Sequence, residues 1–180
     1  MVFLVMEALG RIPEPERHRP LAIASCGNAA LGAAVVARAA DRTLRVFIPT
    51  DADAAVVERL KQLGAELNVC PRHPGVPGDP TYHAFKEAVA AGALPFTCQG
   101  NENGLTIEGG KTLGWEVVSA TLRGAPLPNR LLIQVGGGAL GSAAIQALFE
   151  AKELGLIQRL PVIDAVQTAA CHPRERAWRL

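Results

Sequence analysis

The sequence has 180 residues, of which 49% are hydrophobic and 19% are charged, and its formal net charge at pH 7 is +1. The hydrophobic fraction is large enough to bury a core, and the balanced charge argues against nucleic acid or an anionic membrane as the main partner. No apolar run has the length of a membrane span or a signal peptide, so the sequence predicts a soluble, cytoplasmic protein.

The first part of the chain alternates short apolar runs with segments of helical periodicity. Strands are predicted at residues 20–24, 44–49 and 65–69, with helices at residues 28–40 and 53–63 between them. This β-α-β-α-β order is typical of a parallel sheet whose strands are joined by right-handed crossovers.

The alternation continues through the rest of the chain. A loop rich in proline and glycine is predicted at residues 71–80, and a polar linker at residues 99–104. Helices at residues 81–91, 111–122 and 140–154 alternate with strands at residues 94–97, 130–135 and 162–166. We therefore expect an α/β fold of two three-layer α/β/α units with mainly parallel sheets. The expected domains are a small one at residues 1–102 and a second α/β domain at residues 103–180.

The four cysteines are widely separated in the sequence. They are Cys26, Cys70, Cys98 and Cys171. None belongs to a C-x-x-C pair or to a spacing typical of zinc sites, so reduced thiols and no metal site are predicted.

Three consecutive glycines, Gly136, Gly137 and Gly138, lie between the predicted strand at residues 130–135 and the next helix. Glycine permits a positive φ and a close approach of the backbone to a ligand. The free N–H groups and the dipole at a helix start attract an anion. The turn therefore predicts a phosphate site, and a tight turn without a ligand is the plainer alternative.

The same region also matches a dinucleotide-binding pattern. Gly136, Gly138 and Gly141 satisfy the spacing G-x-G-x-x-G. That pattern requires an acidic residue at the end of the following strand, whereas Asp164 lies inside the predicted strand. An NAD(P)-dependent oxidoreductase is therefore an open alternative.

A second turn, Ser25-Cys26-Gly27-Asn28, also joins a predicted strand to a predicted helix. Serine and asparagine are favoured at helix N-termini, so capping is its plain interpretation. Asn28 could instead offer its side-chain amide to a ring oxygen of a ligand. A third segment, Glu108-Gly109-Gly110-Lys111-Thr112, by itself indicates only the start of a helix.

In this order, the three segments resemble those of the fold-type II pyridoxal-phosphate enzymes, the tryptophan synthase β superfamily. Within it they are most similar to threonine synthase and the serine/threonine ammonia-lyases. The resemblance implies that Asn28 contacts the 3-hydroxyl of pyridoxal 5′-phosphate. The residues implied to bind the cofactor's phosphate are Gly136, Gly137, Gly138, Ala139 and Leu140. Those implied to bind the amino-acid substrate are Ser25, Cys26 and Gly27.

The resemblance also implies an activity. Family members of this kind carry out β-elimination or β-replacement on a hydroxy amino acid or its phosphate ester, and they form homodimers. The expected fold is accordingly an incomplete tryptophan synthase β-like fold.

The lysines depart from the family pattern. Lys61, Lys86, Lys111 and Lys152 all follow the asparagine-containing turn, whereas the family's Schiff-base lysine precedes it. Residues 1–10 resemble the helix that follows that lysine. We therefore expect a chain that is truncated at both ends, carries no catalytic residue and is inactive. A non-catalytic pseudoenzyme that binds a phosphate ligand is the alternative from a different class.

Overall fold

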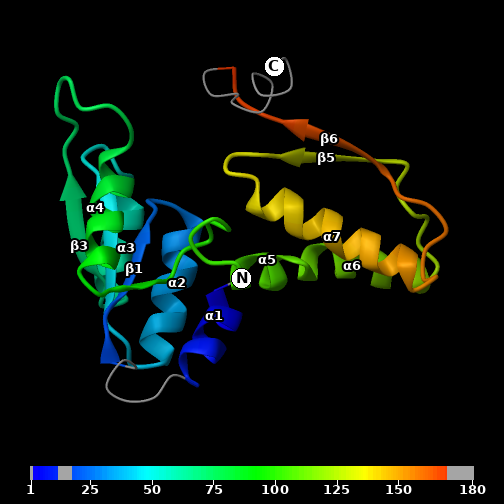
Figure 1. Ribbon diagram of the computed structural model, residues 1–180, viewed down its shortest axis with the longest axis horizontal. Helices are drawn as coiled ribbons and strands as arrows, with labels where there is room; N and C mark the ends of the chain where they lie inside the picture. The colour runs from blue at the N-terminus through cyan, green and yellow to red at the C-terminus, as the bar shows by residue number, and fades with distance from the viewer. Residues whose placement is uncertain (1, 12–17, 170–180) are drawn as a thin grey trace. The chain divides into compact units, whose positions relative to one another are not determined.

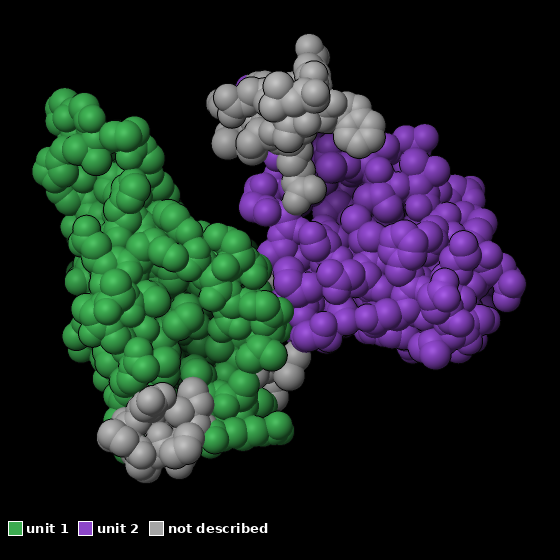
Figure 2. Space-filling model, viewed as in Figure 1, with its two compact units in different colours: residues 1–106 green, residues 107–180 purple. Residues whose placement is uncertain are grey.

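The computed structural model describes residues 2–11 and 18–169, so Cys171 lies outside the described part of the chain. The chain forms two compact units, residues 1–106 and 107–180, which Figure 2 shows in different colours. None of the helices in the described ranges is long and apolar enough to cross a membrane. The elements, most of which are labelled in Figure 1, are α1 (Val2–Leu9), β1 (Leu21–Ala24), α2 (Asn28–Ala39), β2 (Leu44–Pro49), α3 (Ala54–Gln62), β3 (Glu66–Cys70), α4 (Pro80–Ala90), β4 (Leu94–Pro95), α5 (Leu105–Gly110), α6 (Thr112–Leu122), β5 (Arg130–Gln134), α7 (Ala139–Glu153) and β6 (Val162–Val166).

Unit 1, residues 1–106, is built on a four-stranded parallel sheet in the order β3-β2-β1-β4. Three of the four residues of β1 are buried, as expected for a central parallel strand that is covered on both faces. Helices α2 and α3 cover one face, and α4 covers the other. Unit 1 is therefore a three-layer α/β/α arrangement.

Small side chains let α2 lie close to the sheet. Its buried residues are all alanines, at helical spacing: Ala30, Ala33, Ala34 and Ala37. They pack in one cluster with Leu21 and Ile23 of β1. On the opposite face, Phe85 of α4 packs against Ala22 and Phe47. The alternation of side chains along β1 thus supplies both halves of the core.

Two helices of unit 1 begin at aspartate caps. The side chain of Asp53 accepts hydrogen bonds from two backbone N–H groups in the first turn of α3. Asp79 caps α4 in the same way, and Pro80 occupies the first helical position, where its missing N–H costs nothing. These caps fix where the helices start relative to the strands before them.

Unit 2, residues 107–180, contains the two parallel strands β5 and β6, paired from Arg130↔Val162 to Gln134↔Val166. Helices α6 and α7 pack against each other. An apolar cluster connects the two helices to one face of the sheet; its buried residues are Val118, Leu148, Ala151 and Ile157, and its half-buried ones include Leu131 and Ile163.

The opposite face of the β5–β6 sheet is exposed. Because strand residues alternate between faces, Leu132, Val162 and Val166 share the face that points away from Leu131. Their exposed fractions are 71%, 53% and 46%. Among the described residues of unit 2, helices therefore cover one face of this sheet only.

The predicted α/β class with parallel sheets is confirmed. The three layers predicted for both units are present in unit 1, whereas the described residues of unit 2 form two layers. Strand β4 is shorter than the predicted 94–97, although Phe96 N still donates to Ala22 O at 2.8 Å. Helix α5 was not predicted, because Gly109 and Gly110 lower the helix propensity of that segment.

Candidate functional site

The strand order of unit 1 contains a reversal beside β1. From β1 the chain moves to β2 and β3 on one side, and it then returns to the other side of β1 to form β4. In open parallel sheets, ligands bind at the carboxyl ends of the strands where the order reverses. The residues that follow β1 and β4 therefore mark the edge of unit 1 where a ligand site is expected.

The turn Ser25–Asn28 lies at this edge, directly after β1. Ser25 Oγ accepts a 3.4 Å hydrogen bond from Gly27 N. Gly27 is the N-cap of α2, and no side chain caps that helix. Asn28 is the first residue of α2, and its side chain is exposed, as is that of Cys26. Capping therefore does not account for Ser25 and Asn28.

The segment that follows β4 lies at the same edge, because Leu21 and Ala22 of β1 pair in parallel with the two residues of β4. Thr97 is buried, and its Oγ1 accepts a 3.3 Å hydrogen bond from Gln99 N. Gln99 Oε1 is also buried, and no described residue donates a hydrogen bond to it. Burial raises the pKa of the Cys98 thiol, which keeps it protonated near neutral pH.

Sequence reasoning missed this segment. Residues 99–104 were predicted to be a linker, on the strength of their polar and turn-forming composition. The only signal of a role in binding was that these polar residues follow a predicted strand. The sequence does not give the strand order, so it could not show that this strand lies beside β1.

In unit 2, the glycine turn joins β5 to α7. Gly138 is the N-cap of α7 with φ +95°, a conformation that glycine adopts readily and other residues rarely adopt. No side chain caps α7, and its first turn carries no acidic residue. Its first backbone hydrogen bond runs from Ser142 N to Gly138 O at 2.9 Å, so the N–H groups of Ala139 and Leu140 have no partner inside the helix.

The glycine turn fits a phosphate group. No atom lies within 4 Å of the position that a Cβ would take at Gly136 or at Gly137. Both glycines are exposed, so space is present in front of the unpaired N–H groups. The positive end of the α7 dipole adds a favourable potential for an anion.

The packing beneath the turn bears on the dinucleotide alternative. A Cβ at Gly141 would lie 3.5 Å from Val135 Cγ2, an ordinary contact, so close packing does not require the third glycine of the G-x-G-x-x-G pattern. Asp164 binds Arg130 at 2.5 Å within the β5–β6 pair. The carboxylate that a dinucleotide site would use to bind the ribose is therefore already paired with Arg130 on the sheet, away from the end of the strand.

A small apolar cavity lies between the first turn of α7 and the sheet. Its volume is about 60 Å³, and its lining includes Val135, Gly138, Gly141 and Ile163. The cavity is too small for a cofactor, so the phosphate-sized space of unit 2 is in front of the turn rather than behind it.

Lys111 is held between two carboxylates. Its Nζ lies 2.8 Å from Glu108 Oε1 and 2.6 Å from Glu150 Oε1. The hydrogen bonds that Lys111 donates to Glu108 and Glu150 raise the pKa of Lys111, so the amine stays protonated at neutral pH and is a poor nucleophile.

A polar cluster fixes the segment after β4 to helix α4. The carboxylate of Glu102 accepts hydrogen bonds from the Tyr82 hydroxyl, from Lys86 Nζ at 3.0 Å and from Asn101 Nδ2 at 3.0 Å. The side chain of Glu102 is 9% exposed. The bond from Tyr82 lowers the pKa of Glu102 most, and the bond from Lys86 lowers it further. The bond to Glu102 in turn raises the pKa of Lys86 and of Tyr82.

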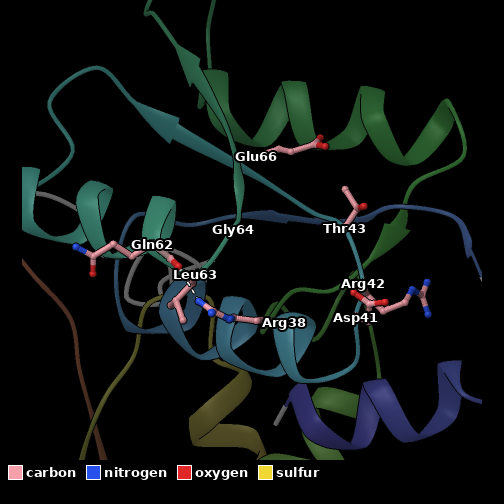
Figure 3. A pocket seen from close by; sticks show the side chains of 8 residues that line it. All are labelled: Arg38, Asp41, Arg42, Thr43, Gln62, Leu63, Gly64 and Glu66. Atoms are coloured by element: carbon pink, nitrogen blue, oxygen red, sulfur yellow. Dashed lines mark hydrogen bonds between the residues drawn. The ribbon is translucent and has the colours of Figure 1, made fainter.

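An open pocket of about 460 Å³ lies at the opposite edge of unit 1, near the amino ends of β2 and β3 (Figure 3). Arg38 Nη1 donates a 2.7 Å hydrogen bond to Gln62 O at the end of α3. Arg38 and Arg42 are balanced by Asp41 and Glu66 in the pocket lining. The pocket therefore has no net charge for an anion, and it is not at the carboxyl edge.

The predicted site residues fall into two groups in separate units. Ser25, Cys26, Gly27 and Asn28 form one turn of unit 1, and Gly136 to Leu140 form the turn and helix start of unit 2. Within the described ranges, no group of three or more histidine, cysteine, aspartate or glutamate residues is arranged to hold a metal ion.

A family model described as "Pyridoxal-phosphate dependent enzyme" matches residues 2–179. No curated protein matches the chain significantly.

Solved structures with the same fold include three enzymes. The processed form of threonine deaminase isoform 2 from Solanum lycopersicum is 19% identical with a TM-score of 0.68, over 92% of this chain and 42% of that one. Maize serine racemase is 19% identical with a TM-score of 0.67, over 91% and 45%. The apo form of Escherichia coli diaminopropionate ammonia lyase is 19% identical with a TM-score of 0.66, over 90% and 43%. The chain thus spans less than half the length of each of these three structures.

Proposed function

Because the chain belongs to the family of pyridoxal-phosphate dependent enzymes, we propose that it binds pyridoxal 5′-phosphate as part of an amino-acid lyase or racemase. The structures with the same fold include a threonine deaminase, a serine racemase and a diaminopropionate ammonia lyase. The proposed substrates are accordingly small amino acids, with hydroxy amino acids and their phosphate esters first. We also retain three predictions from the sequence: a specificity like that of threonine synthase, a homodimer and a cytoplasmic location.

The glycine turn of unit 2 carries this proposal. Gly136, Gly137 and Gly138 leave space in front of an uncapped helix start, where backbone N–H groups and the helix dipole favour a phosphate. In the proposal, the N–H groups from Gly137 to Leu140 bind the 5′-phosphate. When bound, pyridoxal phosphate supplies an electron sink for negative charge that develops on the amino acid.

The turn Ser25–Asn28 of unit 1 is proposed to orient the ligand. The amide of Asn28 donates a hydrogen bond to the 3-hydroxyl oxygen of the cofactor, which sets the direction of the ring. Ser25, Cys26 and Gly27 bind the carboxylate of the amino acid through hydroxyl, thiol and backbone N–H donors. The exposure of Cys26 and Asn28 is compatible with these roles.

Residues 1–180 are proposed to bind the cofactor without turnover. Lys86 and Lys111 are both paired with glutamates. Lys61 belongs to the last turn of α3, and Lys152 to the last turn of α7, at the opposite end of that helix from the glycine turn. In this proposal, none of the four lysines lies where it could act as the catalytic lysine beside the turn Ser25–Asn28 or beside the glycine turn. None of them therefore supplies the acid–base group that the chemistry needs.

The test measures phosphate recognition directly. Pyridoxal 5′-phosphate is titrated into the full chain and followed by ³¹P NMR, with pyridoxal and NADPH as competitors. We expect saturable binding, weaker competition from pyridoxal, which has no phosphate, and none from NADPH. Gly137→Asp places a carboxylate in front of the helix start and should weaken binding by about tenfold or more, because the anion site then repels phosphate.

Gly104→Asp is the matched control. Gly104 is also an exposed glycine with no atom within 4 Å of a Cβ, and it lies outside the glycine turn. Equal loss of binding in both variants, or displacement of the cofactor by NADPH, would contradict the proposal. Turnover of L-serine or L-threonine by the unmodified chain would contradict the part that concerns catalysis.

A further inference from the structure

We propose that Gln167 is a positioning residue of the phosphate site, whose side chain holds the glycine turn in the shape that receives the anion. The inference rests on the proposed function and goes further, because it assigns a role to a residue outside both the turn and α7. It comes from two features of unit 2: the hydrogen bonds that tie Val135 to the end of β6, and the conformational freedom of the glycines that follow Val135.

The glycine turn has little of its own to hold it in one shape. Gly136, Gly137 and Gly138 are consecutive, and glycine has the greatest backbone freedom of any residue. Among the residues that the structure describes, none accepts a hydrogen bond from the N–H groups of these three glycines. An anion site binds best when its N–H groups already point at the ligand. Their direction therefore depends on how the turn is attached at its two ends.

The amino-terminal end of the turn is attached to the end of β6. Val135 N donates a hydrogen bond to Val166 O at 2.8 Å, which extends the parallel pairing of β5 and β6 by one bond. Gln167 Nε2 donates to Val135 O at 3.2 Å. Val135 is buried, and Gln167 is half-buried beside it. Both polar backbone groups of the last residue before the glycines are thus bound by two consecutive residues, Val166 and Gln167.

The bond to Val135 O also sets the peptide plane that enters the turn. A peptide group is planar and trans, so its C=O and its N–H point in opposite directions. The N–H of Gly136 belongs to the same peptide group as Val135 O. By fixing Val135 O, the side chain of Gln167 therefore fixes the direction of the first N–H group of the turn and the starting point for the next two glycines.

The chemistry of glutamine suits this role. Its amide N–H donates to a carbonyl oxygen and carries no charge that changes with pH. A glutamate in its place would offer only acceptors to Val135 O, and it would add a negative charge beside the proposed anion site. A neutral donor keeps the turn in place without repelling the phosphate.

The test measures the motion of the turn and the affinity of the site. Gln167→Met keeps the length of the side chain and removes the donor. Backbone ¹⁵N relaxation of the free full chain should show larger motions of Gly136 and Gly137 in this variant than in the unmodified chain. The dissociation constant for pyridoxal 5′-phosphate, measured by ³¹P NMR, should rise about three- to tenfold, as expected for the loss of one neutral hydrogen bond. Binding of pyridoxal, which has no phosphate, should not change.

The matched control is Gln146→Met. Gln146 is an exposed glutamine of the same unit, in the middle of α7. This variant should match the unmodified chain in both measurements. Unchanged glycine motion or unchanged cofactor affinity in Gln167→Met overturns the inference, and so does an equal loss of affinity for pyridoxal and its phosphate. If the unmodified chain does not bind the cofactor, the proposed function fails, and the motion of the glycines alone decides whether Gln167 positions the turn.

Discussion

The carboxylate of Glu102 connects α4 to the segment that follows β4. Three donors, Tyr82, Lys86 and Asn101, converge on this one side chain. The hydrogen bonds from Tyr82 and then Lys86 stabilise the charged form, which is why the pKa of Glu102 is lowered. The cluster therefore holds the residues beside the proposed substrate site as long as Glu102 is ionised.

This linkage makes part of the stability depend on pH. A carboxyl whose folded pKa is lowered contributes stability that is fully present above its usual value of 4.5 and is lost as the pH falls through the lowered pKa. Glu102→Gln should therefore be less stable than the unmodified chain at pH 7. The difference should shrink as the pH falls to about 3. Urea unfolding, followed by circular dichroism at several pH values, measures it.

Glu87→Gln serves as the control for this prediction. Glu87 is exposed on the same helix, α4, and is not part of the Glu102 cluster. It should leave the acid-dependent loss of stability intact. A constant difference between Glu102→Gln and the unmodified chain from pH 7 to pH 3 would show that the ionised carboxylate is not the cause.

The sequence predicted which residues could contact a ligand better than it predicted the surroundings of those residues in the fold. Ser25 and Asn28 could be identified as ligand candidates because their motif is local, and their place between a strand and a helix could be predicted from it. Gln167 could not, because its contact with Val135 depends on the pairing of β5 with β6, which joins residues far apart in the chain. The pairing of Lys111 with Glu150 was hidden for the same reason.

At the level of elements, the contact between α6 and α7 depends on one missing side chain. A Cβ at Gly114 would lie 2.6 Å from Ala147 Cβ and 2.7 Å from Ala144 O. Neither of these atoms can move without shifting α7. By contrast, Gly32 lies inside α2 with no atom within 4 Å of its missing Cβ.

These two helical glycines should respond in opposite ways to the same substitution. Gly114→Ala should destabilise the protein by about 2 kcal/mol, because the added methyl group forces the helices apart. Gly32→Ala should stabilise it by about 0.5–1 kcal/mol, because alanine has the higher helix propensity. Thermal unfolding measured by circular dichroism compares them. A higher melting temperature for Gly114→Ala would show that the close contact is not required.

The boundaries of most elements could be predicted, because the signals are local. The predicted helices at residues 53–63 and 81–91 begin and end within a residue or two of α3 and α4. Helix α5 and the short β4 could not be predicted, because their limits depend on tertiary contacts rather than on propensity. The order of the strands, which defines the ligand edge of unit 1, has no local signal at all.

At the scale of the whole molecule, the exposed face of the β5–β6 sheet in unit 2 carries large apolar side chains. Leu132, Val162 and Val166 lie on it beside Arg130, Gln134 and Asp164, and both strands also have an open edge among the described residues. Exposed apolar side chains and unpaired strand edges promote association.

We expect the chain to associate as its concentration rises, and Leu132→Lys should reduce this association. Sedimentation velocity at several concentrations measures it. Leu154→Lys is the control, because Leu154 is 68% exposed but lies at the end of α7 rather than on the sheet. A monomer at every concentration, or an equal effect of the two lysines, would contradict this role of the sheet face.

The strand order of unit 1 also has a consequence for the course of folding. In the sequence, only one helix separates β1 from β2, whereas β2, α3, β3 and α4 all lie between β1 and β4 as well. The β1–β4 pairing also covers only two residue pairs. Closing the longer loop costs more chain entropy, so this pairing forms late and opens early. The contact between the segments that follow β1 and β4 is therefore completed last within unit 1. A bound ligand would hold this late contact closed by mass action, so that substrate binding and the final step of folding are thermodynamically coupled.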